Sequence, residues 1–213
     1  MKIFNIVISG TGGQGLITLI QILAEASLLE GYDVKTSELH GLSQRGGSVE
    51  AYVRFGQKVY PPTKKSSRSA QNNKIYPCFS GGVYSPLVPL AGADLVLGLE
   101  LLEGLRMIRY INPKTIFLVN KYIFPFAGGL PEEEILLKIN GLVKNEKHII
   151  PASKICQEEL GAEVVSGIYL LGYAAHKNLI PLKPDLILKA IEKVVPSKRF
   201  ELNKKAFELA QSN

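Results

Sequence analysis

The residues with the clearest chemical potential form a glycine-rich stretch near the N-terminus, Gly10-Thr11-Gly12-Gly13-Gln14-Gly15. Its glycines permit positive φ angles and let a phosphate or another backbone approach closely. If a helix begins directly after them, its first N–H groups and its dipole favour an anion. Gly10, Gly12 and Gly15 also fit the dinucleotide pattern G-x-G-x-x-G, which is a weak signal alone. Three interpretations stay open: a packing turn, a phosphate site for a small ligand, and a surface that contacts a partner's active site.

A second polar group lies between glycines at positions 41, 46 and 47 and consists of His40, Ser43, Gln44 and Arg45. The glycines leave these side chains little covered. Arg45 offers a planar fork for a carboxylate or a phosphate. His40 can donate a hydrogen bond or transfer a proton near neutral pH. The alternatives are a plain surface arginine and a histidine that only holds the end of a strand.

The elements around these residues predict an α/β fold. The apolar run from Ile3 to Ile8 indicates a strand, and the pattern from Leu16 to Leu29 indicates a helix. The glycine stretch therefore falls in a strand-to-helix turn. Because this first helix is apolar nearly all the way round, we expect it to be covered on more than one side, by another layer or another subunit. Asp33 to Leu39 predicts strand two.

The segment after strand two departs from an ordinary dinucleotide-binding domain. Such a domain continues into a second crossover helix, whereas this chain enters an alternating strand from Val49 to Phe55, with a hairpin turn expected at positions 56 to 58. Glu38 stands where an acid that binds ribose is expected. A free-standing dinucleotide-binding enzyme or regulatory module therefore remains the alternative function, although the missing helix argues against it.

The rest of the chain predicts further alternation of strands and helices, with a buried strand at 93–98 whose end is straddled by Asp94 and Glu100. These two acids are interpreted as a polar strand terminus and a helix entry rather than an acid/base pair. Acids at 132–134 complement a helix dipole. The remaining expected elements are a helix at 101–110, strands at 115–120 and 148–150, and helices at 152–160, 167–177, 184–195 and 201–210.

Composition limits the function classes. The chain has 213 residues, of which 46% are hydrophobic, enough for one α/β domain over 1–213. No apolar run reaches the length of a membrane span and no signal-peptide pattern begins the chain, so we expect a cytoplasmic protein without a membrane partner. The formal net charge is +6. Because no nucleic-acid-binding motif accompanies the basic residues, no nucleic-acid partner is predicted; an RNA-binding protein would rest on charge alone.

The cysteines and histidines predict no cofactor bound by this chain alone. Cys78 and Cys156 are far apart, and two thiols cannot ligate a four-cysteine iron–sulfur cluster. The three histidines, at 40, 148 and 176, are scattered, so no metal site is expected.

Several motifs together resemble a known family. The glycine stretch, the segment from Glu38 to Ser48, Tyr52-Val53-Arg54-Phe55-Gly56, and Gly92-Ala93-Asp94 with Glu100 are similar to the gamma-type domain of the 2-oxoacid (pyruvate/indolepyruvate) ferredoxin oxidoreductases. Within this family, the chain most resembles the small beta subunit of the indolepyruvate type. The resemblance covers nearly the whole chain. It implies a three-layer, doubly wound, Rossmann-like sheet with a β-hairpin after strand two and a helical C-terminal region.

The resemblance implies a division of labour between subunits. Thiamine diphosphate, magnesium and the iron–sulfur clusters belong to a large partner subunit, which passes electrons to ferredoxin. The implied reaction is oxidative decarboxylation of an aryl-2-oxoacid with coenzyme A, giving an acyl-CoA, and the isolated chain is expected to be inactive. No residue here is assigned a catalytic role. Contacts to the active site, coenzyme A or the partner are expected from Gly10, Gly12, Gly13, Gln14, Gly15, Glu38, His40, Ser43, Gln44 and Arg45.

Residues 61–83 depart from the family pattern, because a segment rich in Pro, Ser, Lys and Asn intervenes there. It predicts a loop insertion, either a tolerated surface loop or a docking arm for the partner. A homodimer of the isolated chain is the remaining alternative for assembly, if helix one leaves an apolar face to cover.

Overall fold

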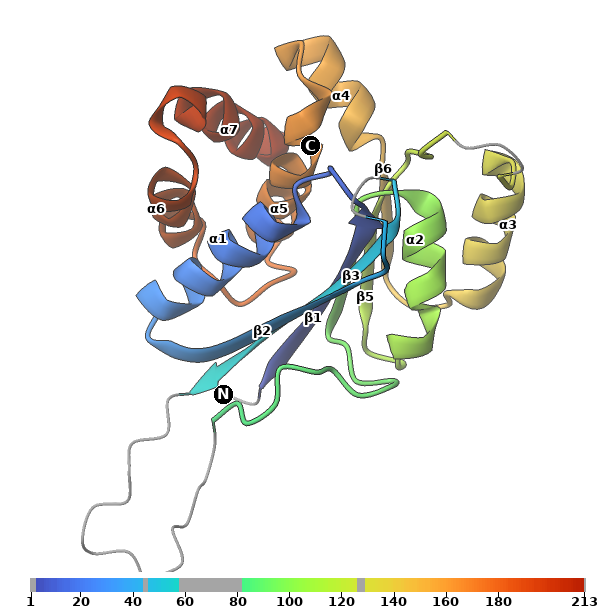
Figure 1. The fold of residues 1–213 in the computed structure, drawn as a ribbon, viewed down its shortest axis with the longest axis horizontal. Coiled ribbons are helices and arrows are strands. Elements are labelled where there is room, and N and C mark those ends of the chain that lie inside the picture. The colour runs from blue at the N-terminus through green and yellow to red at the C-terminus, as the bar shows by residue number, and fades with distance from the viewer. Residues whose placement is uncertain (1–2, 44–45, 58–81, 126–128, 213) are drawn as a thin grey trace, which may run out of the picture.

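A computed structural model of the chain describes residues 3–43, 46–57, 82–125 and 129–212. Its centre is a six-stranded sheet in the order β2-β3-β1-β4-β5-β6 (Figure 1). Strand β3 runs antiparallel to both β1 and β2, whereas β1, β4, β5 and β6 run parallel to one another. The strands are β1 (Phe4–Thr11), β2 (Tyr32–His40), β3 (Ser48–Gln57), β4 (Leu95–Gly98), β5 (Ile116–Asn120) and β6 (Lys147–Ile150).

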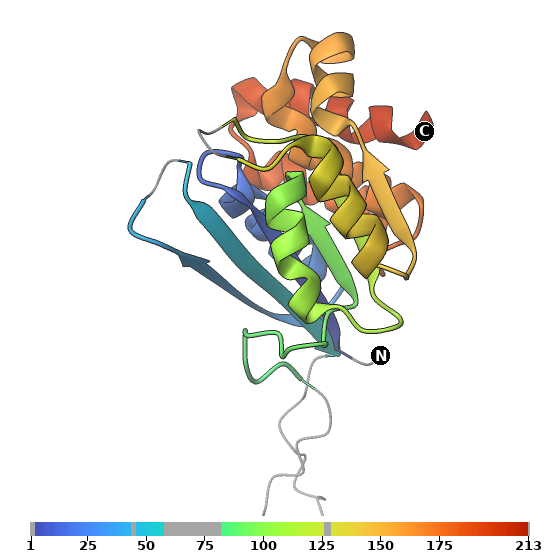
Figure 2. The ribbon, with the colours of Figure 1, turned by 90° about the vertical axis from the view of Figure 1, so that its right-hand side faces the viewer.

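Helices cover both faces of this sheet, which makes three layers. One face carries α2 (Leu101–Arg106) and α3 (Glu132–Leu142), which stand in front of the strands in Figure 2. The other face carries the first helix and the helical C-terminal region: α1 (Leu16–Leu29), α4 (Ala152–Leu160), α5 (Ser166–His176), α6 (Pro184–Val194) and α7 (Ser197–Leu209). Short 3₁₀ turns are η1 (Met107–Tyr110), η2 (Glu163–Val165) and η3 (Ala210–Ser212). The predicted doubly wound α/β fold is thereby confirmed.

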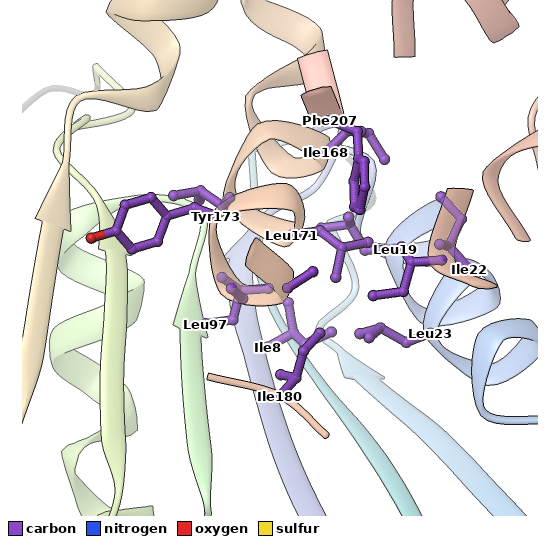
Figure 3. Packing of buried hydrophobic residues seen from close by; sticks show 14 of the residues in the cluster. Ile8, Leu19, Ile22, Leu23, Leu97, Ile168, Leu171, Tyr173, Ile180 and Phe207 are labelled. Carbon is purple, nitrogen blue, oxygen red and sulfur yellow. The ribbon is translucent and has the colours of Figure 1, made fainter. Parts of the chain in front are cut away.

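The larger core lies between the sheet and the C-terminal helices. Figure 3 shows Ile8 and Leu97 from the strands meeting Leu19 and Leu23 of α1 and Leu171 of α5. All five side chains are at most 1% exposed, and removing each from water is worth about 1.5–3 kcal/mol. This packing fixes α1 on the sheet and so fixes the turn that precedes it.

Helix α1 is covered on more than one side, as its sequence predicts. It packs on β2 and β3 and against α6. Three apolar side chains nevertheless stay outside: Ile17 is 56% exposed, Leu28 48% and Leu29 44%. Ile17 lies in the first turn of α1 and Leu28 and Leu29 lie in its last turn, so these exposed side chains form two separate apolar spots at the ends of the helix.

One local prediction is wrong. The turn expected at positions 56 to 58 does not begin there, because Gly56 and Gln57 continue β3 and pair with Asp33 and Tyr32. Strand β2 starts at Tyr32 and is long enough to extend the ladder to this point. Antiparallel pairing of β2 with β3 makes the predicted hairpin, joined through residues 41–47. Most of the predicted insertion at 61–83 lies outside the described residues, as does Lys58.

No helix in the described part of the chain combines the length and the apolar character needed to cross a membrane.

Candidate functional site

The glycine stretch lies at the end of β1, the strand from which the chain connections run to opposite sides of the sheet. From β1, the chain crosses through α1 to β2 on one side, while β4 lies on the other side of β1. Ligands of open α/β sheets bind outside the carboxyl ends of the strands at such a switch point. The turn from Thr11 to Leu16 and the end of β4 at Gly98 meet at this edge.

The turn presents the bare N-terminus of α1. Gly15 is the N-cap residue, with φ 81°, and no side chain caps the helix. Gly13 has φ 107°, another conformation that an L side chain rarely adopts. Because the first N–H groups of a helix have no partner within the helix, and no acid occupies the first turn of α1, this end carries partial positive charge. It can hold an anion.

Gly10 and Gln14 shape this turn from inside. The side-chain oxygen of Gln14 accepts the backbone N–H of Thr11 at 2.8 Å. A Cβ on Gly10 would lie 2.5 Å from that oxygen and 3.0 Å from Cβ of Leu99. Both residues therefore have a structural role in the turn, whatever they contact in a complex.

The second glycine loop joins the first through its backbone. The N–H of Gly12 donates to the carbonyl of Gly47 at 2.9 Å, and the N–H of Gly46 donates to the carbonyl of Gly12 at 3.2 Å. The two motifs that stand far apart in sequence thus form one surface. Gln44 and Arg45, which were predicted to contribute to it, lie outside the described residues.

A cavity of about 510 Å³ opens between the two loops. It brings the turn residues Gly12, Gly13 and Gly15 together with Glu38, His40 and Ser43. Glu38 and His40 are two residues apart on β2, so they share a face of the strand. A ligand with an anionic group at the N-terminus of α1 would therefore share the cavity with the side chains of His40 and Ser43. The carboxylate of Glu38 can accept a hydrogen bond from a hydroxyl of the same ligand.

A smaller polar cavity of about 160 Å³ lies on the β4 side of the same edge. Glu103, only 3% exposed, accepts a hydrogen bond from the Ser48 hydroxyl and pairs with Arg106. Glu100, 2% exposed, caps α2 by accepting the N–H groups of Leu102 and Glu103. Burial raises the pKa of the Glu100 carboxyl, against the effect of these N–H groups. The helix-entry role predicted for Glu100 is confirmed.

Sequence reasoning missed this second cavity. Glu103 and Arg106 belong to no motif, and Ser48, the last residue of the second motif, meets them only through the packing of the folded chain. Asp94, in contrast, lies at the opposite end of β4 and accepts the N–H of Asn5. Asp94 and Glu100 therefore do not form an acid/base pair.

The described residues contain no group of three or more His, Cys, Asp or Glu side chains placed to hold a metal ion. Cys156 is buried in the larger core, and burial raises the pKa of its thiol to about 11. His148 contacts Tyr173 and Glu146, and the ring of His176 packs on Phe207. Neither of these histidines lines the cavity at the glycine loops.

The fold and the site together define a Rossmann-like α/β domain with two joined glycine loops at its topological switch point. Residues 5–212 match the family described as pyruvate ferredoxin/flavodoxin oxidoreductase. The chain belongs to this family.

Three relatives illustrate the match. The chain is 33% identical over 215 residues to the indolepyruvate oxidoreductase subunit IorB of Pyrococcus horikoshii, covering 98% of this chain and 95% of the relative. The pyruvate oxidoreductase subunit PORC of Thermotoga maritima superposes with a TM-score of 0.67 at 20% identity, covering 100% and 97% of the two chains. The 2-oxoglutarate:ferredoxin oxidoreductase of Magnetococcus marinus superposes with a TM-score of 0.67 at 18% identity, over 100% of this chain but 31% of the other. The two structural matches show a shared fold.

Proposed function

We propose that this chain is the small subunit of a 2-oxoacid:ferredoxin oxidoreductase that acts on indolepyruvate or another aryl-2-oxoacid. The observation that carries the proposal is the 33% identity to an indolepyruvate oxidoreductase subunit along almost all of both chains. Within the Magnetococcus marinus enzyme, the same fold is one part of a longer chain. This supports a domain that works beside others rather than alone. The reaction is oxidative decarboxylation with coenzyme A, which yields an acyl-CoA, carbon dioxide and reduced ferredoxin.

The cofactors of this reaction are assigned to the large partner subunit. Thiamine diphosphate with magnesium supplies the decarboxylation chemistry there, and iron–sulfur clusters accept the electrons. The donor chemistry of this chain does not fit a cluster, because its sequence has two cysteines and a cubane needs four thiolates. Cys156, moreover, lies within the apolar core with a raised pKa, unlike a thiolate ligand.

The role of this chain is then to bind and to orient. The N-terminus of α1 at Gly13 and Gly15 receives a phosphate of coenzyme A or the carboxylate of the 2-oxoacid. His40 and Ser43 contact the same group from β2 and its loop, and Arg45 is proposed to join them. The carboxylate of Glu38 accepts a hydrogen bond from a hydroxyl of the ligand. Packing of the partner on the exposed side chain of Ile17, which lines the cavity, excludes water from the site.

The alternative, a free-standing dinucleotide-binding module, is disfavoured by the sheet order. In a dinucleotide-binding domain the acid that binds ribose follows a strand next to β1. Here β3 lies between β1 and β2. The strand that carries Glu38 is therefore two strand spacings, about 10 Å, from β1, instead of one.

The proposal is tested by producing this chain with its cognate large subunit and assaying anaerobic dye reduction by indolepyruvate and other 2-oxoacids, with and without coenzyme A. Each chain alone is the control. Activity that needs both chains and coenzyme A supports the assignment, and its loss in Arg45→Ala supports the second loop as part of the site. Two chains that do not associate, together with binding of NAD by this chain alone, would support the dinucleotide alternative instead.

A further inference from the structure

A third cavity, of about 440 Å³, lies on the side of the glycine turn that faces the C-terminal helices. It shares Gly13, Gly15 and Thr18 with the cavity between the glycine loops, but none of the residues that β2 and β3 contribute there. Its volume falls within the range of pockets that enclose small organic ligands, about 300–1,000 Å³. It is therefore a separate space, large enough for a ligand of its own.

The electrostatic character of this third cavity is positive. The starts of three helices line it, those of α1 at Gly15, α5 at Val165 and α7 at Pro196. None of the three is capped by a side chain or has an acid in its first turn. Glu163, which precedes α5, interacts with Tyr122, and no acid of the described residues lines the cavity. Because the first N–H groups of a helix carry partial positive charge, the three starts favour an anion between them.

Arg199 adds a full positive charge to these partial ones. It lies in the first turn of α7, lines the cavity and forms no ion pair with a carboxylate of the described residues. Two lysines nearby in sequence differ, since Lys193 pairs with Glu25 and Lys204 with Glu208. A cation in the first turn of a helix also opposes the helix dipole. An oxyanion in the cavity would balance both charges.

Asn203 supplies an acceptor at the wall of this cavity. The residue is only 8% exposed, and its Nδ2 donates to the carbonyl of Arg199 at 2.7 Å, which fixes the amide. Its Oδ1 has no hydrogen-bond partner among the described residues and is not sealed off by protein atoms. Because a polar atom at such depth costs free energy when it stays unpaired, Oδ1 favours a ligand that donates to it.

The rest of the wall is apolar. Leu19, Val165, Ile168 and Val195 all line the cavity and are between 1% and 6% exposed. They favour an apolar body of the ligand over an isolated ion. The single guanidinium balances one negative charge, and its planar fork matches the two oxygens of a carboxylate.

We infer that the third cavity binds a small aryl carboxylate that carries an N–H or O–H donor. The carboxylate accepts hydrogen bonds from the Arg199 guanidinium and from N–H groups at the helix starts. The ring packs among the apolar side chains, and the donor bonds to Asn203 Oδ1. This site needs only the present chain, so it goes beyond the proposed function and is tested without a partner subunit.

Indoleacetate is the probe, because it combines a carboxylate, a flat apolar ring and a ring N–H. It is titrated into the isotope-labelled full-length chain, and the amide signals are followed by NMR. Signals of Gly167 and of the Asn203 side chain should shift, since both line the third cavity only, whereas the signal of Val49, which lines the cavity between the glycine loops, should not. Shifts at Val49 without shifts at Gly167 overturn the inference and leave the proposed function untouched. An absence of shifts at millimolar probe also overturns it.

Arg199→Gln should weaken the binding of indoleacetate about tenfold, because the carboxylate loses its charged donor. Lys198→Gln is the matched control. Lys198 is an exposed cation of the same helical turn, also without an ion pair among the described residues, but it does not line the cavity. Its substitution should leave the affinity unchanged. Equal losses in the two variants would show attraction at a distance instead of a contact, and the inference would be wrong.

Changes to the probe test the other two contacts without altering the protein. The derivative of indoleacetate that is methylated on the ring nitrogen cannot donate to Asn203 Oδ1, so it should bind about fivefold more weakly. The neutral alcohol indole-ethanol lacks the carboxylate and should bind about tenfold more weakly or worse. Inorganic phosphate should not displace indoleacetate at equal concentration. If it does, the cavity holds an anion without using its apolar wall, and the inference fails.

Discussion

The side chain of Gln14 fills the space that a Cβ on Gly10 would take, at the turn between β1 and α1. The Gln14 oxygen that accepts the Thr11 N–H stands 2.5 Å from where a Cβ on Gly10 would lie. The first glycine of the motif is therefore needed for packing and not for a positive φ angle, in contrast to Gly13 and Gly15. One motif thus contains two physically different requirements for glycine.

Gly10→Ala should destabilise the chain by about 1–3 kcal/mol, since the new methyl group displaces Gln14 and crowds Leu99. Gln14→Ala should cost about 1 kcal/mol through the same lost hydrogen bond. Because the two substitutions share this loss, the double variant should cost less than the sum of the single ones. Urea unfolding of the four proteins measures the coupling. Strict additivity would contradict the shared role.

Gly141→Ala is the control for glycine replacement in general. Gly141 lies in α3, has no atoms within 4 Å of the position that a methyl group would take, and does not have a positive φ. Alanine there should stabilise the chain by up to about 1 kcal/mol, because glycine is the poorer helix former. A loss of stability in this variant would show that glycine replacement is not tolerated even where space allows.

A buried network on the other face of the sheet predicts a dependence on high pH. Glu50, 8% exposed, accepts hydrogen bonds from the hydroxyls of Tyr52 and Tyr110 and pairs with Arg109. The pKa of Tyr52 is raised far above its usual range, mainly by burial and next by the hydrogen bond to Glu50. The folded chain keeps this proton where the unfolded chain loses it, above a pH of about 10. The stability due to this group is therefore present below a pH of about 10 and lost as pH rises further.

Tyr52→Phe removes this linkage. The free energy of unfolding of the wild type should fall more steeply between about pH 10 and 11.5, by up to about 1.4 kcal/mol per pH unit, than that of the variant. At neutral pH the variant should be less stable by about 1–2 kcal/mol, since Glu50 loses a donor. Urea titrations at a series of pH values test both statements. Parallel pH profiles for the two proteins would mean that Tyr52 ionises normally in the fold.

The sequence predicts much of this fold because its signals are local. Apolar periodicity identifies β1 and α1, and the alternation of apolar with polar residues identifies β3. The turn predicted at Gly56 is wrong because strand length depends on the partner strand, and β2 supplies pairing as far as Gln57. The Ser48–Glu103 contact could not be predicted, since it joins residues 55 positions apart through tertiary packing alone.

Cys156 should resist alkylation in the native protein. It is completely buried, and a thiol whose pKa is about 11 has little reactive thiolate near pH 8. In a Cys78→Ser background, iodoacetamide should label the chain slowly in buffer and rapidly in denaturing urea, with mass spectrometry as the readout. Rapid labelling without urea would show that α4 opens readily or that the thiol is not in the core.

His40→Ala tests whether the larger cavity holds an anionic substrate. His40 and Gly13 line the same space, so removal of the ring takes one donor from a ligand bound at the N-terminus of α1. In the assembled enzyme, the KM for the ligand that uses this cavity, coenzyme A or the 2-oxoacid, should rise about tenfold while kcat changes little, as expected when uniform binding is lost. Steady-state kinetics with each substrate varied in turn identifies which one it is.

Lys35→Ala provides the matched control, because Lys35 is an exposed cation of the same strand that does not line the cavity. It should leave both KM values unchanged, which separates a contact in the cavity from a general loss of positive charge. Equal effects of the two substitutions would point to long-range attraction of the anion. If His40→Ala instead lowers kcat with both KM values intact, the histidine acts on the chemical step or on assembly of the active site, and the binding role assigned to this cavity is wrong.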